Sequence, residues 1–268
     1  MLRDTKVVHC CEPTGNIKCY IQMEQVLFRD LGKMSYSDAW TLQTEIHRDL
    51  INNKLAHREL PMEDFSQTHQ FLYVEHPPVF TLGKSGSVEN LLLSPEELDA
   101  RSIEYYPINR GGDITYHGPG QIVCYPILDL DRFFNDVHKY VRNLEEMVIR
   151  TLAEFGIKGF RIKDYTGVWV EGLPSRPVAA DETAFFKQQR KICAIGVHMS
   201  RWTTLHGLAF NVNTDLSYFD LIVPCGINDQ DKAVTSMEKE LGQRMDIEDV
   251  KSRLSRHFEA VFGCTLTK

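Results

Sequence analysis

Apolar residues recur at helical spacing in several stretches of the chain. The most regular stretch covers residues 135–155, where Val141, Leu144 and Val148 share one face and the pattern ends at Gly156. This spacing predicts an amphipathic helix with a glycine stop. Other predicted helices cover residues 35–58, 234–241 and 246–262, and a further helix starts at Ser94, where Ser-Pro-Glu-Glu supplies a cap, a first-turn proline and a capping box.

Short runs of apolar residues lie between these helices and predict strands. They cover residues 71–75, 79–82, 122–130, 167–170, 192–199, 205–212 and 221–223. Because the strands cluster instead of alternating one for one with helices, they favour a mixed sheet over a doubly wound nucleotide-binding fold. The predicted fold class is α/β (α+β), a mixed β-sheet with flanking helices.

Two segments lack such patterns. Residues 1–16 are predicted to be a loose terminus. Residues 171–190 combine two prolines, small residues and charges between two predicted strands. That composition is typical of an exposed insertion.

Composition narrows the class of protein. The 268 residues carry 30 Lys+Arg and 37 Asp+Glu, a net charge of −7, and no basic block, so general nucleic-acid binding is not expected. No apolar run reaches the ~18 residues of a membrane span, and the first residues lack a secretory or transit pattern. Seven dispersed cysteines without Cys-x-x-Cys argue against disulfides and structural zinc. We therefore expect a cytoplasmic protein with free thiols and no membrane partner.

Residues 110–121, RGGDITYHGPGQ, concentrate groups that could contact a ligand. Glycines allow close backbone approach, Arg110 offers a fork of donors, and His117 can donate, accept or carry charge. A tight hairpin with a satisfied histidine would have the same composition, and the residues leave both interpretations open. Residues 83–85, Gly-Lys-Ser, do not predict a phosphate loop, because Pro78 occupies the position of the required glycine.

Cys225 has the context most typical of a reactive thiol. It lies between Pro224 and Gly226, after an apolar stretch and before a polar loop. A nucleophilic thiol needs a partner that keeps it ionised, since the free pKa is roughly 8.5; histidine or a lysine ammonium can serve. Lys191 opens a strand-like run, but a solvated lysine and an inert cysteine remain open alternatives. The histidines show no metal-binding spacing, and those in strand-like runs are expected to be structural.

Four motifs, in this order, resemble those of the lipoyl(octanoyl) transferase family, also called the lipoate–protein ligase B family. They are residues 110–121, Lys191-Ile-Cys-Ala-Ile-Gly196, His206-Gly-Leu-Ala209 with Asn211-Val-Asn213, and Pro224-Cys225-Gly226. The resemblance starts near Leu31. It implies one catalytic domain over residues 31–268 with an N-terminal extension over 1–30 and an exposed insertion over 171–190. The implied fold is that of the biotin protein ligase/lipoate–protein ligase catalytic domain.

The resemblance also implies roles for individual residues. Cys225 would be the nucleophile that carries the acyl thioester, and Lys191, 34 positions earlier, would lower the pKa of that thiol and act as acid and base. The implied acyl-binding residues are Arg110, Gly111, Gly112, Asp113, Ile114, Thr115, Tyr116, His117, Ala194, Ile195, Gly196, Gly207, Leu208 and Ala209.

The implied reaction moves an octanoyl group from octanoyl-acyl carrier protein to a lysine of a lipoyl domain, the first step of endogenous protein lipoylation. The acceptor would be the glycine-cleavage H protein or a 2-oxo-acid dehydrogenase E2 component. Because a thioester becomes an amide, neither ATP, a metal nor another cofactor is expected; the phosphopantetheine arrives on the carrier. The alternatives are an ATP-dependent lipoate or biotin protein ligase on the same fold, and a non-catalytic module that binds acyl chains or carrier proteins.

Overall fold

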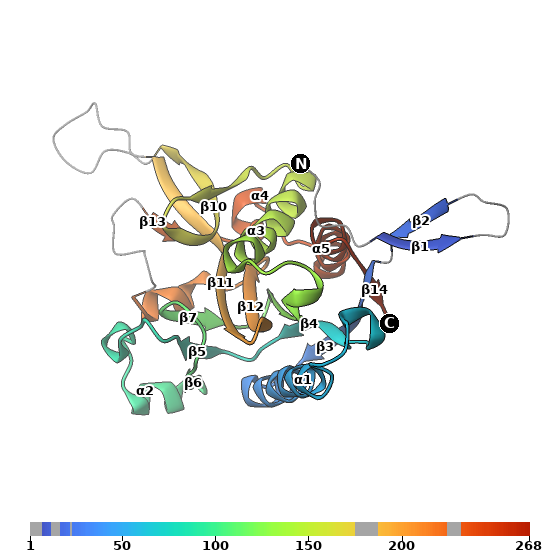
Figure 1. Ribbon diagram of the computed structural model, residues 1–268. Helices are drawn as coiled ribbons and strands as arrows, with labels where there is room; N and C mark the ends of the chain where they lie inside the picture. Colours follow the sequence, from blue (N-terminus) through green and yellow to red (C-terminus); the bar gives the residue numbers. More distant parts are fainter. Residues whose placement is uncertain (1–6, 12–16, 22, 175–186, 224–231) are drawn as a thin grey trace.

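A mixed β-sheet forms the centre of the computed structural model, which describes residues 7–11, 17–21, 23–174, 187–223 and 232–268 (Figure 1). Across the sheet the strands are β14 (Cys264–Thr267), β3 (Glu24–Lys33), β4 (His69–Glu75), β8 (Gln121–Ile127), β12 (Thr203–Asn211), β11 (Lys187–Ser200), β10 (Tyr165–Pro174) and β9 (Gly159–Ile162). A short strand, β13 (Lys232–Val234), pairs in parallel with the start of β11. The β14–β3 and β3–β4 pairs are also parallel, whereas the remaining pairs of this sheet are antiparallel.

Two smaller sheets complete the strands of the described residues. The first contains β6 (Glu104–Pro107), β5 (Val79–Leu82) and β7 (Ile114–His117), and the second is the hairpin of β1 (Val7–Cys11) and β2 (Ile17–Ile21). The α-helices are α1 (Tyr36–Ala56), α2 (Pro95–Ala100), α3 (Val137–Glu154), α4 (Met237–Leu241) and α5 (Ile247–Phe262). Short 3-10 turns cover Met62–Asp64, Val88–Asn90, Leu130–Arg132 and Leu216–Leu221.

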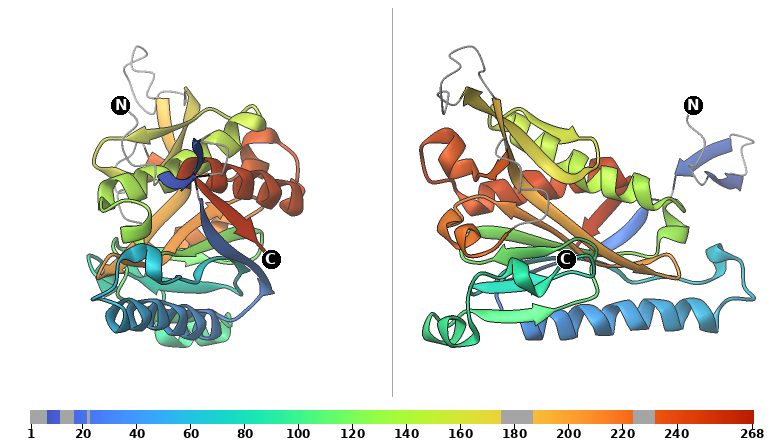
Figure 2. Two further views of the ribbon diagram at one scale, coloured as in Figure 1. Left: turned by 45° about the vertical axis from the view of Figure 1, so that its right-hand side comes forward. Right: turned by 90° about the vertical axis from the view of Figure 1, so that its left-hand side faces the viewer.

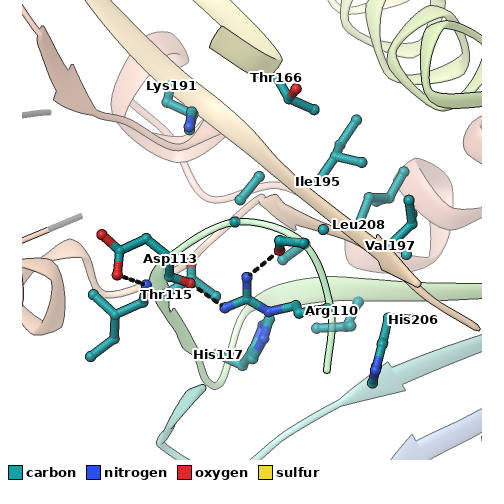
Figure 3. Close-up of a pocket in the computed structure, with 18 of the residues that line it drawn as sticks. Arg110, Asp113, Thr115, His117, Thr166, Lys191, Ile195, Val197, His206 and Leu208 are labelled. Atoms are coloured by element: carbon teal, nitrogen blue, oxygen red, sulfur yellow. Dashed lines mark hydrogen bonds between the residues drawn. The ribbon is translucent and has the colours of Figure 1, made fainter. Parts of the chain in front are cut away.

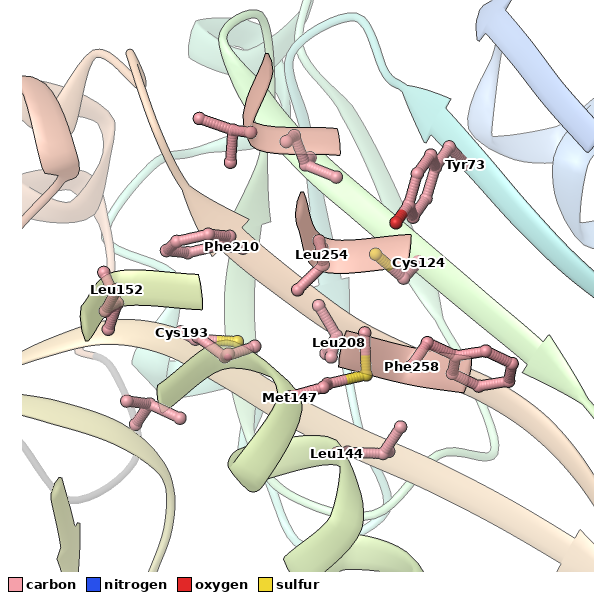
Figure 4. Packing of buried hydrophobic residues seen from close by; sticks show 14 of the residues in the cluster. Tyr73, Cys124, Leu144, Met147, Leu152, Cys193, Leu208, Phe210, Leu254 and Phe258 are labelled. Carbon is pink, nitrogen blue, oxygen red and sulfur yellow. The ribbon is translucent and has the colours of Figure 1, made fainter. Parts of the chain in front are cut away.

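Helices cover both faces of the large sheet (Figure 2). Successive side chains of a strand point to opposite faces, and β4 follows this rule: Leu72 belongs to the apolar cluster with α1, whereas Phe71 belongs to the cluster with α3 and α5. The Phe71 ring stacks on Phe258 of α5 at 4.1 Å between centroids, and Figure 4 shows this second cluster around Met147 and Leu208. The large sheet is therefore buried on both faces, as its nearly continuous apolar strands require.

The predicted helices are confirmed, but the helix predicted from residue 234 starts only at Met237, because Lys232–Val234 forms strand β13. Ser35, Ser94, Asp136 and Asp246 cap α1, α2, α3 and α5 with side-chain acceptors, and Ser94 forms the predicted capping box with Glu97. The mixed sheet with flanking helices, the predicted fold class, is confirmed as well. No helix in the described ranges is long and apolar enough to span a membrane.

Three segment boundaries predicted from the sequence differ from the strands that the structure contains. The proposed extension over residues 1–30 includes most of β3, which is integral to the large sheet, so the boundary near residue 30 cuts a strand. The ends of the predicted insertion are strand too, because Glu171 of β10 pairs with Gln189 of β11; residues 175–186 lie outside the described residues. Residues 221–223 do not form a strand: Leu221 ends a 3-10 turn and Ile222 makes only an isolated bridge to Leu91.

Candidate active site

A cavity of about 380 Å³ lies between the glycine-rich segment and strands β11 and β12 (Figure 3). Its volume is within the ordinary range for small-molecule sites. Figure 3 shows Lys191 and Thr166 toward one end of the cavity and His206 toward the other. The predicted site residues that line it are Arg110, Gly111, Gly112, Asp113, Ile114, Thr115, His117, Lys191, Ala194, Ile195, Gly196, Gly207, Leu208 and Ala209.

Tyr116 is the predicted acyl-binding residue that does not line the cavity. It belongs to β7, where its neighbours Thr115 and His117 do line the cavity. Because strand side chains alternate between faces, Tyr116 turns the other way and stacks on Tyr218 at 4.5 Å between ring centroids. The side chain of Tyr116 therefore packs in the smaller sheet, outside the lining of the cavity.

Arg110 holds the glycine-rich loop together. Its buried guanidinium donates to the carbonyl oxygens of Gly111 (2.9 Å), Thr81 (2.7 Å) and Asp113 (2.8 Å). The amides of residues 83–85 donate in turn to the carbonyls of residues 113, 110 and 112. These amides are thus engaged within the protein, in agreement with the prediction that residues 83–85 are not a phosphate loop.

His117 is fixed as a neutral imidazole. Gln121 donates through Nε2 to the carbonyl of Tyr116 and to Asn211 Oδ1, so its Oε1 accepts from His117 Nδ1 (2.9 Å). His117 Nε2 is left to accept from the Thr81 hydroxyl (3.3 Å). Burial, with His76 nearby, lowers the pKa of His117 to about 3. The imidazole therefore belongs to a buried hydrogen-bond network.

This buried histidine predicts acid-sensitive stability. Between the ordinary histidine pKa of 6.5 and the folded pKa of about 3, His117 binds a proton in the unfolded chain but not in the folded protein. The free energy of unfolding should therefore fall by up to about 1.4 kcal/mol per pH unit in that window, and should be insensitive to this group above it. Urea unfolding at pH 7 and pH 5 measures the loss, which should be about 2 kcal/mol smaller in His117→Asn. Equal losses in the two proteins would contradict this interpretation.

Lys191 lies in β11 at the wall of the cavity, half-buried. Its Nζ is 4.8 Å from the centroid of the Trp169 ring on β10. Its carbonyl accepts from the Thr235 amide (2.9 Å), and its backbone pairs with Val234 of β13. Thr235 in turn accepts at its carbonyl from Asn211 Nδ2 (3.0 Å), which connects the lysine's strand to the His117 network.

Cys225 and the rest of residues 224–231 lie outside the described residues, but both flanks of this segment are anchored beside the cavity. The amide of Val223 donates to the carbonyl of Asn90 (2.7 Å), and Asn90 Nδ2 donates to Asp113 of the glycine-rich loop (2.6 Å). After the segment, β13 pairs with Gln189 to Lys191, and Val234 lines the cavity.

Three other cysteines, Cys124, Cys193 and Cys264, are buried, as expected for small apolar side chains. Burial raises the pKa of all three thiols, to about 12 for Cys264. A buried thiol of this kind is a poor nucleophile because its thiolate is scarce. Among the described residues, no group of three or more His, Cys, Asp and Glu could hold a metal ion.

Other residues also line the cavity without having been predicted to do so. Tyr36, Val123 and Tyr125 contribute from α1 and β8, and His206, expected to be structural, contributes from β12. His206 has a left-handed backbone (φ 62°), and its Nε2 contacts Asn109 Oδ1 at 2.9 Å. These contributions depend on how distant strands pair, which local composition does not reveal.

Gly207 shows how tightly β12 approaches β8 beside the cavity. A Cβ there would lie 2.0 Å from the carbonyl oxygen of Cys124, a backbone atom that cannot turn away. We expect Gly207→Ala to lower the free energy of unfolding by about 3 kcal/mol and the thermal midpoint by roughly 10 °C. Gly111→Ala is the matched control, since its nearest contact would be an ordinary 3.5 Å. Equal midpoints for the two variants would contradict the close approach.

The fold of the chain is that of the lipoate–protein ligases. Lipoate-protein ligase A bound with ATP superposes with a TM-score of 0.60 over 92% of this chain and 88% of its own, at 15% identity. The bipartite lipoate protein ligase of Thermoplasma acidophilum gives a TM-score of 0.59 over 92% of this chain and 87% of its own, also at 15% identity. At these identities the likeness shows the fold alone, and it confirms the lipoate–protein ligase part of the predicted architecture.

Residues 35–259 match the family model described as lipoyl protein ligase A/B catalytic domain, and the chain belongs to this family. Among its curated relatives are proteins named octanoyltransferase. That of Christiangramia forsetii is 50% identical, with 91% of this chain and 98% of the relative covered. That of Cytophaga hutchinsonii is 51% identical, with 89% of this chain and 93% of the relative covered. One from Bacteroides fragilis is 47% identical, with 86% of this chain and 95% of the relative covered.

Proposed function

We propose that this acyltransferase moves an octanoyl group to a lysine of lipoyl domains through an acyl thioester on Cys225. The relatives named octanoyltransferase support the enzyme class and the acyl group. The observation that carries the assignment of Cys225 is that Lys191 and Val234 line one cavity, while Val223 is tied through Asn90 to Asp113 in the same lining. Two residues of chain span at most about 7 Å, so the anchored Val223 supports a thiol near this cavity.

The cavity suits an acyl chain. Ile195, Val197 and Leu208 present aliphatic side chains to it, and Ala194, Gly196 and Gly207 leave room between them. Burial of each methylene contributes roughly 0.8 kcal/mol, which favours a medium-length chain over a short acyl group. The carbonyl end of the chain would lie toward Lys191, since that end of the cavity carries the ammonium.

In the first step the Cys225 thiolate attacks the thioester carbonyl carbon of octanoyl-acyl carrier protein. A new carbon–sulfur bond forms, the bond to the phosphopantetheine sulfur breaks, and Lys191 gives its proton to the departing thiolate. Lys191 is then a neutral amine beside the octanoyl-enzyme. Before this step its ammonium favours the thiolate over the thiol, because opposite charges attract.

In the second step the neutral amine of a lysine on the lipoyl domain attacks the enzyme thioester. The carbon–nitrogen bond of the amide forms, Cys225 leaves as thiolate, and the proton from the attacking nitrogen passes to Lys191. Both side chains return to their starting states. The sequence of steps consumes no ATP and requires no metal, because a thioester supplies the driving force for the amide.

An ATP-free transfer assay tests this function. Purified protein is incubated with octanoyl-acyl carrier protein, and the adduct is mapped by peptide mass spectrometry before apo-H protein or an E2 lipoyl domain is added. We expect an octanoyl mass on Cys225 that moves to the acceptor lysine. Transfer only with ATP and free octanoate would favour a ligase, and acyl binding without transfer would favour a binding module; either result would overturn the proposal.

A further inference from the structure

Trp169 places its indole ring against the lysine of the proposed site. The residue is fully buried in β10, and Lys191 Nζ lies 4.8 Å from the ring centroid. We propose that Trp169 is a positioning residue that holds the Lys191 ammonium at the cavity wall for acyl transfer. This inference rests on the proposed function, because it assigns to Trp169 a role exerted through Lys191.

An irregularity in the β10–β11 pairing brings the two side chains together. Val168 pairs with Cys193, and regular antiparallel pairing would then place Trp169 opposite Ile192, a buried core residue. The register shifts at this point, and Trp169 pairs with Lys191 instead. Bulges of this kind redirect side chains beside functional sites. Directly paired residues share a face of the sheet, so the shift turns the indole toward the lysine.

Neighbouring groups hold this irregular pairing. Gly167 has φ +125°, and a Cβ there would lie 2.5 Å from the Cys193 carbonyl and 3.4 Å from Lys191 Cε, so only glycine fits. Its amide donates to the buried Glu145 carboxylate of α3 (3.1 Å). The Trp169 Nε1 donates to the Tyr165 carbonyl (3.3 Å), and the Tyr165 ring packs edge-on against the indole. The ring is thus fixed before any substrate binds.

A cation over an indole face is attracted by the ring quadrupole, most strongly where water is excluded. The contact favours the protonated lysine and limits the rotamers of its long side chain. The backbone carbonyl of Lys191 is already tied to the Thr235 amide. Among the described residues, the charged and titratable groups around this part of the site include Cys193 on β11, Glu145 on α3, Tyr165 and Asp164 at β10, Arg110 and Asp113 in the glycine-rich loop and Lys232 on β13. Glu145 also pairs with Arg142 and Arg161.

Substitutions of Trp169 test the inference through the pH profile of Cys225. Trp169→Leu removes the aromatic face, and Trp169→Phe keeps a weaker one. We expect the pH midpoint of Cys225 alkylation by iodoacetamide to rise by about half a unit or more in the leucine variant and by less in the phenylalanine variant, with transfer lowered about 5- to 30-fold in the former. Phe71→Leu, a core aromatic on β4, controls for general loss of packing and should leave the midpoint unchanged.

The decisive comparison uses Lys191→Met as background. If Trp169 acts through the lysine, Trp169→Phe should shift the midpoint in wild type and should cause no further shift in Lys191→Met. An unshifted midpoint in the single phenylalanine variant would overturn the inference, even where Trp169→Leu does not fold. If wild type forms the octanoyl adduct on Cys225 and the Trp169 substitutions leave the alkylation midpoint unchanged, the proposed function stands and only this inference fails. If wild type forms no adduct on Cys225, the proposed function itself fails.

Discussion

Replacing Cys225 with alanine is expected to abolish the octanoyl-enzyme and to lower transfer to a lipoyl domain by about 10³-fold or more. Without the thiol, the acyl group must pass directly from the carrier thioester to the acceptor amine, and the two-step path is lost. The measurement is single-turnover transfer from radiolabelled octanoyl-acyl carrier protein, with the protein-bound label resolved by gel. Thermal unfolding should be almost unchanged, so the loss is one of chemistry.

Cys193 provides the matched control. It lies two residues after Lys191 in β11 and is the rival thiol for the role of nucleophile. Its side chain is fully buried in the core, and burial raises the pKa of its thiol. Cys193→Ala should therefore keep the octanoyl adduct and lose only stability. An adduct on another residue, or near-normal transfer by Cys225→Ala, would refute the assignment of Cys225.

The helices were predictable because their patterns are local. The apolar stripe of α3 and the capping side chains of Ser94 and Asp246 act within a few residues of each other. Strands such as β3 and β14 were not, because EQVLFRDLGK and CTLT carry mixed polar patterns. They become strands through parallel pairing with β4 and with each other, which depends on residues far away in sequence.

The candidate site was predictable as a set of motifs, but its geometry was not. Residues 110–121 proved to contain a strand, β7, whose alternation turns His117 toward the cavity and Tyr116 away from it. Arg110, predicted as a ligand-binding fork, directs its donors to the carbonyls of Gly111 and Asp113 in the loop and of Thr81 in β5. The sequence predicts Trp169 only as part of a strand, because its contact with Lys191 arises from a register shift that no sequence spacing indicates.

Replacing Lys191 with methionine should lower acyl transfer by about 10²- to 10⁴-fold, the usual contribution of a positioned acid and base. It should also raise the pH midpoint of Cys225 alkylation by about one unit or more, since removal of a nearby cation makes the thiolate less favourable. The sign follows from the charge: at a given pH below the new midpoint, less thiolate is present in the variant. Iodoacetamide kinetics between pH 5 and 10, followed by mass spectrometry of the Cys225 peptide, measure this midpoint.

Lys191→Arg separates the two roles of the lysine. A guanidinium keeps the positive charge but does not release its proton in the accessible pH range. The arginine variant should therefore alkylate near the wild-type midpoint and still transfer the octanoyl group poorly.

Lys139→Met is the matched control for Lys191→Met. Lys139 lies on α3, outside the lining of the cavity, and its ammonium also lies over an aromatic ring, 4.5 Å from the centroid of Phe134. Were Lys191→Met to leave the alkylation midpoint unchanged, Lys191 would not be the cation that ionises Cys225. Were Lys191→Arg to transfer normally, proton exchange by the lysine would be unnecessary and its charge alone would account for its role.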